Sequence, residues 1–259
     1  MILSHTVTYK NLHWLPALSL VILGCSAPVD STEQTTEGWD SAGGNPTHAT
    51  HSYLTEHALD SLQDMHPDLV TYRSDVLTGA NLELHELPVK DAEQERLRVE
   101  AGGTNWGCEH PEVYWNHAQE RWLAGDYAKA YWFVGIVLHF VEDLGVPAHA
   151  LHVWHENTPS TWDHFELMAF QHWAPSYASI NRSDPWYASP ADYVAVSGDW
   201  AASDFHATFP GVAYTRTFFS KTWLFAPHVQ KTFMQNRQGR TATVAAWALE
   251  AAAEELEAL

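Results

Sequence analysis

The sequence predicts an all-α, single-domain helical bundle, and three features support this prediction. Apolar residues recur at the three- and four-residue spacing of a helix face in several segments. No alternation of apolar and polar residues lasts long enough to build a sheet. The chain has 259 residues, of which 46% are hydrophobic, which is enough to bury one substantial core.

The expected helices are separated by glycine, proline and polar stretches. Residues 126–144 are apolar on nearly all sides, so we expect them to form the central, buried helix, ended by Gly145 and Pro147. Residues 74–110 are expected to hold loops and one helix, and residues 174–212, rich in Pro, Ser and Asp, to be extended loops. The remaining helices are expected at residues 50–66, 92–100, 111–125, 160–170, 214–235 and 241–256.

The first 25 residues have the composition of an export signal rather than of a folded element. Their apolar stretch is too short to span a membrane comfortably, and it ends in Ile22-Leu23-Gly24-Cys25, which resembles a bacterial lipobox. Residues 26–38 are then a polar tether or propeptide, and residues 39–259 the folded domain. We therefore predict an exported protein, either secreted or held at the membrane surface of the cell envelope by a lipid on Cys25.

The formal net charge of −19 restricts the class of partner. Proteins that bind nucleic acid generally present a basic surface, because neutralising phosphates supplies much of the affinity. A general nucleic-acid binder is therefore disfavoured. Bound divalent cations would reverse the sign of the charge locally, which weakens this argument for a site that holds several of them.

Histidine and aspartate meet on the predicted central helix. His139 and Asp143 are four residues apart and so project from one face. A carboxylate on such an apolar helix needs a partner, which is either a histidine within the core or a metal ion. His149 follows Pro147, where the chain turns back toward the same helix end. Imidazole and carboxylate together are ligands typical of zinc.

This part of the chain resembles the bacterial zinc-dependent phospholipase C family and, more distantly, the fungal zinc nucleases. The resemblance implies an all-helical fold with up to three zinc ions in a cleft. It implies that Asp143 is shared by two ions, that His139 binds the first of them, and that His149 binds the separate third ion. The matching residues are Ala124-Gly125-Asp126-Tyr127, Ala130, His139-Phe140, Asp143, Pro147 and His149.

The same resemblance extends to the start of the predicted domain. In the family, a mature N-terminal tryptophan binds zinc through its amino and carbonyl groups, helped by a histidine a short distance further on. It implies cleavage before Trp39, with His51 as the helping histidine and His48 as a weaker substitute. A lipid on Cys25 would leave Trp39 an ordinary amide, so the two predictions conflict unless a second cleavage follows lipidation.

The other ligands that the family requires match less closely. For the third ion, Glu166 matches, and we expect His155 to accompany it, with the pair His152 and Glu156 as a rival. For the first ion, the family's His-aromatic-aromatic-Asp-Pro run is missing. The residues that take its place are His85 as the histidine and Glu83 or Asp75 as the carboxylate.

The resemblance implies a zinc-dependent hydrolase of phosphodiesters that cleaves a phospholipid headgroup bond. Asp143 would bridge two ions, and Glu83 or Asp75 would act as general base. Two alternatives remain open. One is a zinc nuclease for single strands, and the other is a non-catalytic surface lipoprotein that keeps a metal site for stability.

Overall fold

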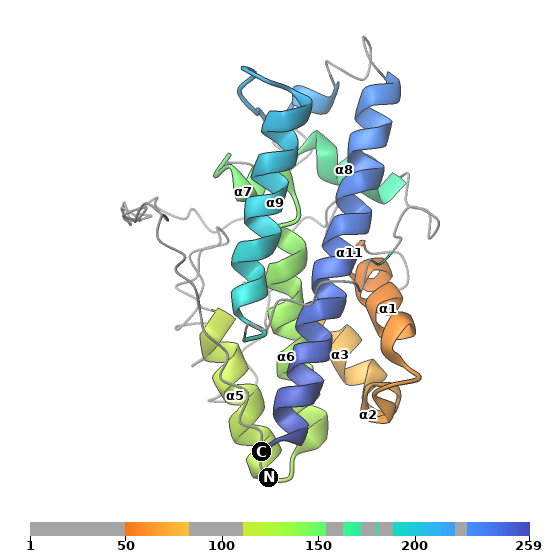
Figure 1. The fold of residues 1–259 in the computed structure, drawn as a ribbon, viewed down its shortest axis with the longest axis vertical. Helices are drawn as coiled ribbons and strands as arrows, with labels where there is room; N and C mark the ends of the chain where they lie inside the picture. The colour runs from red at the N-terminus through yellow and green to blue at the C-terminus, as the bar shows by residue number, and fades with distance from the viewer. Residues whose placement is uncertain (1–49, 83–110, 154–162, 172–179, 181–188, 221–226) are drawn as a thin grey trace, which may run out of the picture. The chain divides into compact units, whose positions relative to one another are not determined.

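The computed structural model describes residues 50–82, 111–153, 163–171, 180, 189–220 and 227–259. All of them belong to one compact unit, residues 31–259. The described part of the chain folds into helices without any strand, which confirms the prediction of an all-α domain (Figure 1). The predicted signal, the tether, Trp39 and the predicted helix at 92–100 lie outside the described residues.

The helix α6 (Tyr127–Asp143) is the centre of the bundle, as its apolar sequence predicts. From Ala130 to Glu142 all but one of its side chains are buried. The helices that pack around it are α1 (Thr50–Leu62), α3 (Arg73–Ala80), α5 (Pro111–Leu123), α9 (Asp192–Thr208) and α11 (Pro227–Glu257).

The boundaries of α5 and α6 follow from local sequence. Pro111 occupies the first turn of α5, where its missing N–H costs nothing. Gly125 has a φ of +77°, a left-handed conformation that glycine adopts without strain, and it turns the chain from α5 into α6.

Two glycines allow α3 and α6 to touch through their backbones. A Cβ atom on Gly79 would lie 2.0 Å from the carbonyl oxygen of Trp132, and one on Gly135 would lie 2.1 Å from that of Val76. Only glycine fits at either position. This contact brings the C-terminal end of α3 against the middle of α6.

Several predicted boundaries are wrong. Residues 192–208 form α9 rather than a loop, because Tyr193, Ser197, Ala201 and Phe205 recur every four residues and bury one face. The predicted loop after residue 74 contains most of α3, and a short helix α2 (Pro67–Thr71) precedes it.

The prediction of two separate closing helices, at residues 214–235 and 241–256, is also wrong. From residue 227 onward the chain is one helix, α11, which continues through Gly239 to Glu257. Arg237, Gln238 and Gly239 are buried there, so packing keeps the helix intact where the sequence suggests a break.

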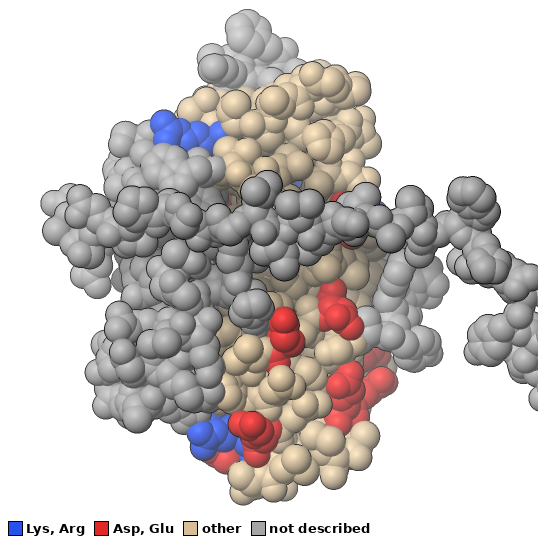
Figure 2. Space-filling model, turned by 90° about the vertical axis from the view of Figure 1, so that its left-hand side faces the viewer, with Lys and Arg blue, Asp and Glu red and all other residues tan. Residues whose placement is uncertain are grey.

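The surface agrees with the acidic composition. On the face shown in Figure 2, Asp and Glu cover more of the described surface than Lys and Arg do. Among the helices described, none is both long and apolar enough to cross a membrane.

Candidate metal centre

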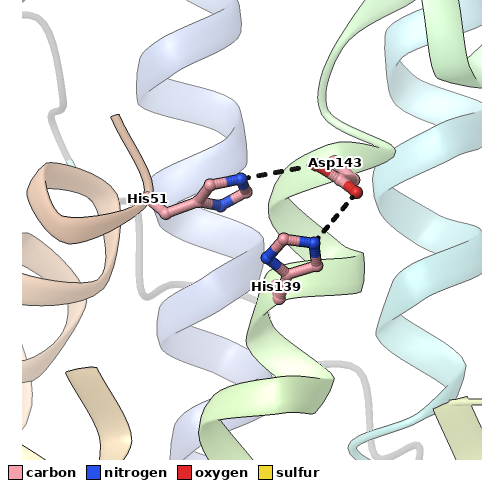
Figure 3. A group of neighbouring side chains, drawn as sticks. All are labelled: His51, His139 and Asp143. Atoms are coloured by element: carbon pink, nitrogen blue, oxygen red, sulfur yellow. Dashed lines mark ion pairs between the residues drawn. The ribbon is translucent and has the colours of Figure 1, made fainter. Parts of the chain in front are cut away.

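Three side chains from two helices converge beside the end of α6 (Figure 3). His51 comes from the first turn of α1, and His139 and Asp143 from the last turns of α6. The Nε2 atom of His51 lies 3.4 Å from Oδ1 of Asp143, and Nε2 of His139 lies 3.3 Å from Oδ2. The two imidazole rings stack with their centroids 4.5 Å apart.

These separations are compatible with ligands around a metal ion. With bonds of about 2.0–2.1 Å in a tetrahedron, neighbouring ligand atoms lie about 3.3 Å apart. Direct hydrogen bonds between nitrogen and oxygen are usually shorter, at roughly 2.7–3.2 Å. The group therefore has the size that a bound ion requires.

The other nitrogen of each imidazole has a fixed partner. Nδ1 of His51 lies 2.7 Å from Oε2 of Glu142, and Nδ1 of His139 lies 3.0 Å from the carbonyl oxygen of Ala80. The carbonyl accepts, as does Glu142 when it is ionised, so each Nδ1 then carries a proton and donates it. In the neutral form of that tautomer each Nε2 presents a lone pair toward Asp143, which is how metal-binding histidines are usually oriented, whereas a protonated Nε2 donates to Asp143 instead.

The sequence prediction missed Glu142, which contacts His51. It is fully buried, and its second oxygen accepts a 2.7 Å hydrogen bond from the hydroxyl of Thr55. The signal was present in the sequence, because Glu142 is a charged residue three positions after His139 on an otherwise apolar helix.

The charges in the group act on one another strongly. Burial lowers the pKa of His51, but its contacts with Asp143 and Glu142 outweigh burial and raise the pKa to about 10. Burial raises the pKa of Asp143, but the charges of His139 and His149 bring it well below its ordinary value. The group thus attracts a cation, and a proton on imidazole is one such cation.

Of the three side chains in the His51 group, Asp143 is the most exposed to solvent. The side chain of His51 is 1% exposed and that of His139 is 7% exposed, whereas that of Asp143 is 26% exposed. A ligand from solvent can therefore reach the carboxylate without displacing either helix.

A second histidine–carboxylate pair follows α6. His149, in α7 (Pro147–Ala150), has its Nε2 atom 3.1 Å from Oε1 of Glu166, in α8 (His164–Gln171). The neighbouring Asp163 has a structural role instead: it accepts the N–H of Phe165 and the hydroxyl of Tyr214.

The predicted site residues thus fall into four sets. His51, His139 and Asp143 come together, and His149 meets Glu166. Asp75, in the first turn of α3, is not part of the His51 group. The remaining predicted ligands lie outside the described residues: Trp39, Glu83, His85 and His155.

Comparison with protein-family models and with curated proteins finds no match to this chain. The assignment of a function therefore depends on the geometry of the site itself.

Proposed function

We propose that this protein is a zinc-dependent phosphodiester hydrolase that cleaves a phospholipid headgroup bond in the manner of a phospholipase C. One observation carries the proposal: two imidazoles present Nε2 to a shared, partly exposed carboxylate while their Nδ1 atoms are held by fixed acceptors.

The donor set suits zinc better than a hard cation. Two nitrogens and a carboxylate are common zinc ligands, whereas calcium and magnesium prefer oxygen alone. The buried carboxylate of Glu142 behind His51 repeats the carboxylate–histidine–zinc arrangement of known sites.

The two oxygens of Asp143 support a cluster rather than a single ion. Each oxygen faces a different imidazole, as expected of an aspartate shared by two ions. His149 and Glu166 would hold a third ion, because their side chains already meet and His149 acts electrostatically on Asp143.

In the reaction, this chain's residues would position the ions and leave one side open to substrate. When bound, zinc lowers the pKa of water and neutralises charge on the phosphoryl group. Glu142 and the carbonyl of Ala80 would hold His51 and His139 in their metal-binding tautomers. Glu83 remains our candidate general base, a role that requires its carboxylate to reach the attacking water.

The charge of the chain favours a lipid over nucleic acid. With a net charge of −19, the protein repels a polyanion, whereas a cationic headgroup such as choline suits an acidic surface. A lipid on Cys25, if present, would hold the enzyme beside such a substrate.

The test combines metal content with turnover. We expect zinc in the protein purified without chelator, and hydrolysis of a chromogenic phosphocholine ester in preference to single-stranded DNA. Degradation of DNA alone would favour the nuclease, and zinc without turnover of either substrate would favour a stabilising metal site. A protein without zinc whose melting temperature is unchanged by added zinc would contradict the proposal.

The role of the second pair can be tested separately. His149→Ala should release one ion and leave the ions at Asp143 in place, because His149 contacts Glu166 from α7 rather than lying within the His51 group. Counting zinc per chain in the variant and in the wild type checks this. Loss of every ion would show that the two groups are one site.

A further inference from the structure

A second group of ligands lies at the opposite end of α1. His66 follows α1, whose range ends at Leu62, and caps the start of α2, while Glu250 and Glu254 lie one turn apart near the end of α11. One imidazole nitrogen and one oxygen from each carboxylate all lie within 4.8 Å of one another. His51 and His66 are fifteen positions apart, or about 20 Å along a helix, so this group is separate from the one at Asp143.

The imidazole of His66 points to a ligand. The residue is 7% exposed, and its buried Nδ1 atom has no hydrogen-bond partner. The carboxylate of Glu257 is close, with Oε1 at 3.6 Å from Nδ1, which is beyond hydrogen-bonding distance. A buried ring nitrogen left without a hydrogen bond costs free energy unless something else satisfies it.

The surroundings of His66 are acidic and hold a second unsatisfied polar atom. The hydroxyl of Tyr131 is buried and has no hydrogen-bond partner. Burial, and then the charges of Asp68 and Glu257, raise the pKa of this phenol. Four carboxylates from α2 and α11 therefore lie near His66 or influence Tyr131: those of Asp68, Glu250, Glu254 and Glu257.

We propose that His66, Glu250 and Glu254 bind a divalent transition-metal ion, with zinc the natural occupant, that fastens the last turns of α11 to the turn between α1 and α2. The imidazole selects against calcium and magnesium, and the two carboxylates supply the negative charge that a divalent ion needs. A tetrahedral ion requires ligand atoms about 3.3 Å apart, so the group must contract slightly on binding. The exposed side chain of Glu254 can make that movement.

The ion would have a structural role. Figure 1 shows α1 and α11 packed beside each other, and the ion would join them at the end remote from His51. Because α1 also carries His51, fastening its far end restricts the helix on which one ligand of the first site depends. The inference does not rest on the proposed hydrolase activity, since it uses none of the residues of that site.

The experiment compares Glu254→Gln with Glu56→Gln in the full chain. Glu56 is an exposed glutamate on α1, and its replacement removes the same charge. We expect Glu56→Gln to bind as many zinc ions as the wild type, and Glu254→Gln to bind one fewer or to bind that one at least tenfold more weakly. Adding calcium should not displace this ion.

Hydrogen exchange locates the effect. Zinc should slow exchange of backbone amides in residues 62–72 of the wild type and of Glu56→Gln, and should leave them unchanged in Glu254→Gln and His66→Gln. Equal zinc counts and equal protection in all four proteins would overturn the proposal. The first site does not enter this comparison, because its ligands are intact in every variant.

Discussion

Two buried groups of this protein each place two basic side chains against an aspartate, but they differ in how donors pair with acceptors. In one, the guanidinium of Arg237, with no exposed surface, contacts Asp204 at 2.7 Å and the carbonyl of Gly145 at 3.2 Å. Arg240 also contacts Asp204. In the other, two imidazole Nε2 atoms face the carboxylate of Asp143.

The difference lies in the pairing of donors with acceptors. Around Arg237, each donor named above meets an acceptor, so the group is complete and its role is to hold α11 against α9 and the end of α6. Around Asp143, Glu142 and the carbonyl of Ala80 already take the Nδ1 protons, so neutral imidazoles turn the lone pairs of Nε2 toward the carboxylate. Such an arrangement is stable only with a cation between the acceptors, either a proton or a metal ion. Burial of charge alone does not identify a functional site.

The strongest test exchanges a carboxylate for an amide in each group. Asp143→Asn should abolish zinc binding at the His51 group and reduce turnover below detection, because the amide cannot neutralise the ions. Asp204→Asn should instead retain zinc and lower the free energy of unfolding by about 3 kcal/mol, since it leaves Arg237 buried without its counter-charge. Zinc content, turnover and denaturant unfolding measure the three effects. Loss of zinc in both variants would mean that the two groups are not independent.

A smaller effect on zinc binding is expected from Glu142, which contacts the ligand histidine His51 without binding the ion itself. Glu142→Gln keeps the shape of the side chain but removes the charge that supports His51, so zinc affinity should fall by roughly 10–100-fold. Glu120→Gln is the matched control, because Glu120 also contacts a histidine, His117, at 3.1 Å, but lies on α5 and is 72% exposed. Zinc titrations of both variants check the prediction. Equal zinc affinities of the Glu142→Gln and Glu120→Gln variants would contradict a supporting role for Glu142.

The glycine contact between α3 and α6 makes a third prediction. A methyl group at residue 135 would meet the carbonyl oxygen of Val76 at 2.1 Å, so Gly135→Ala should push α3 away from α6. We expect a loss of about 1–3 kcal/mol in unfolding free energy and weaker zinc binding, as the Ala80 carbonyl moves from His139.

The helical glycine of α9 provides the control. Gly198→Ala would meet only the flexible side chain of Leu144, with Cδ1 at 3.1 Å, and should be neutral or stabilise the protein by up to about 1 kcal/mol. Thermal unfolding with and without zinc compares the two variants. A Gly135→Ala protein that is as stable as Gly198→Ala would show that the helices do not need this close contact.

The least pronounced effect is on the pH dependence of stability. Without metal, the folded-state pKa of His51 is about 10, above its ordinary 6.5, so the folded chain holds an extra proton between these values. This contribution to stability is complete below pH 6.5 and is lost as pH rises toward 10. In chelator, the melting temperature should therefore fall between pH 6.5 and 8. With zinc it should fall less or rise, because the ion replaces that proton. Parallel curves of melting temperature against pH, with chelator and with zinc, would contradict this coupling between the His51 proton and the metal ion.

The sequence by itself determined the helical class, the buried character of α6 and the pairing of His139 with Asp143. These features depend on spacing within one helix, which a 3.6-residue period fixes regardless of the rest of the fold. It also identified α5 and α6 from Pro111 and Gly125. It failed at α9 and at the middle of α11, where small or polar residues form helix because neighbouring helices cover them.

Only the tertiary structure decided which distant groups complete the site. Glu142 meets His51 across 91 positions, and the carbonyl of Ala80 meets His139 across 59. Nothing in local spacing encodes these contacts. They arise because Gly79 and Gly135 let two helix backbones touch and because α1 packs its first turn against the end of α6. Local periodicity places a ligand on a face, whereas packing between helices determines what that face meets.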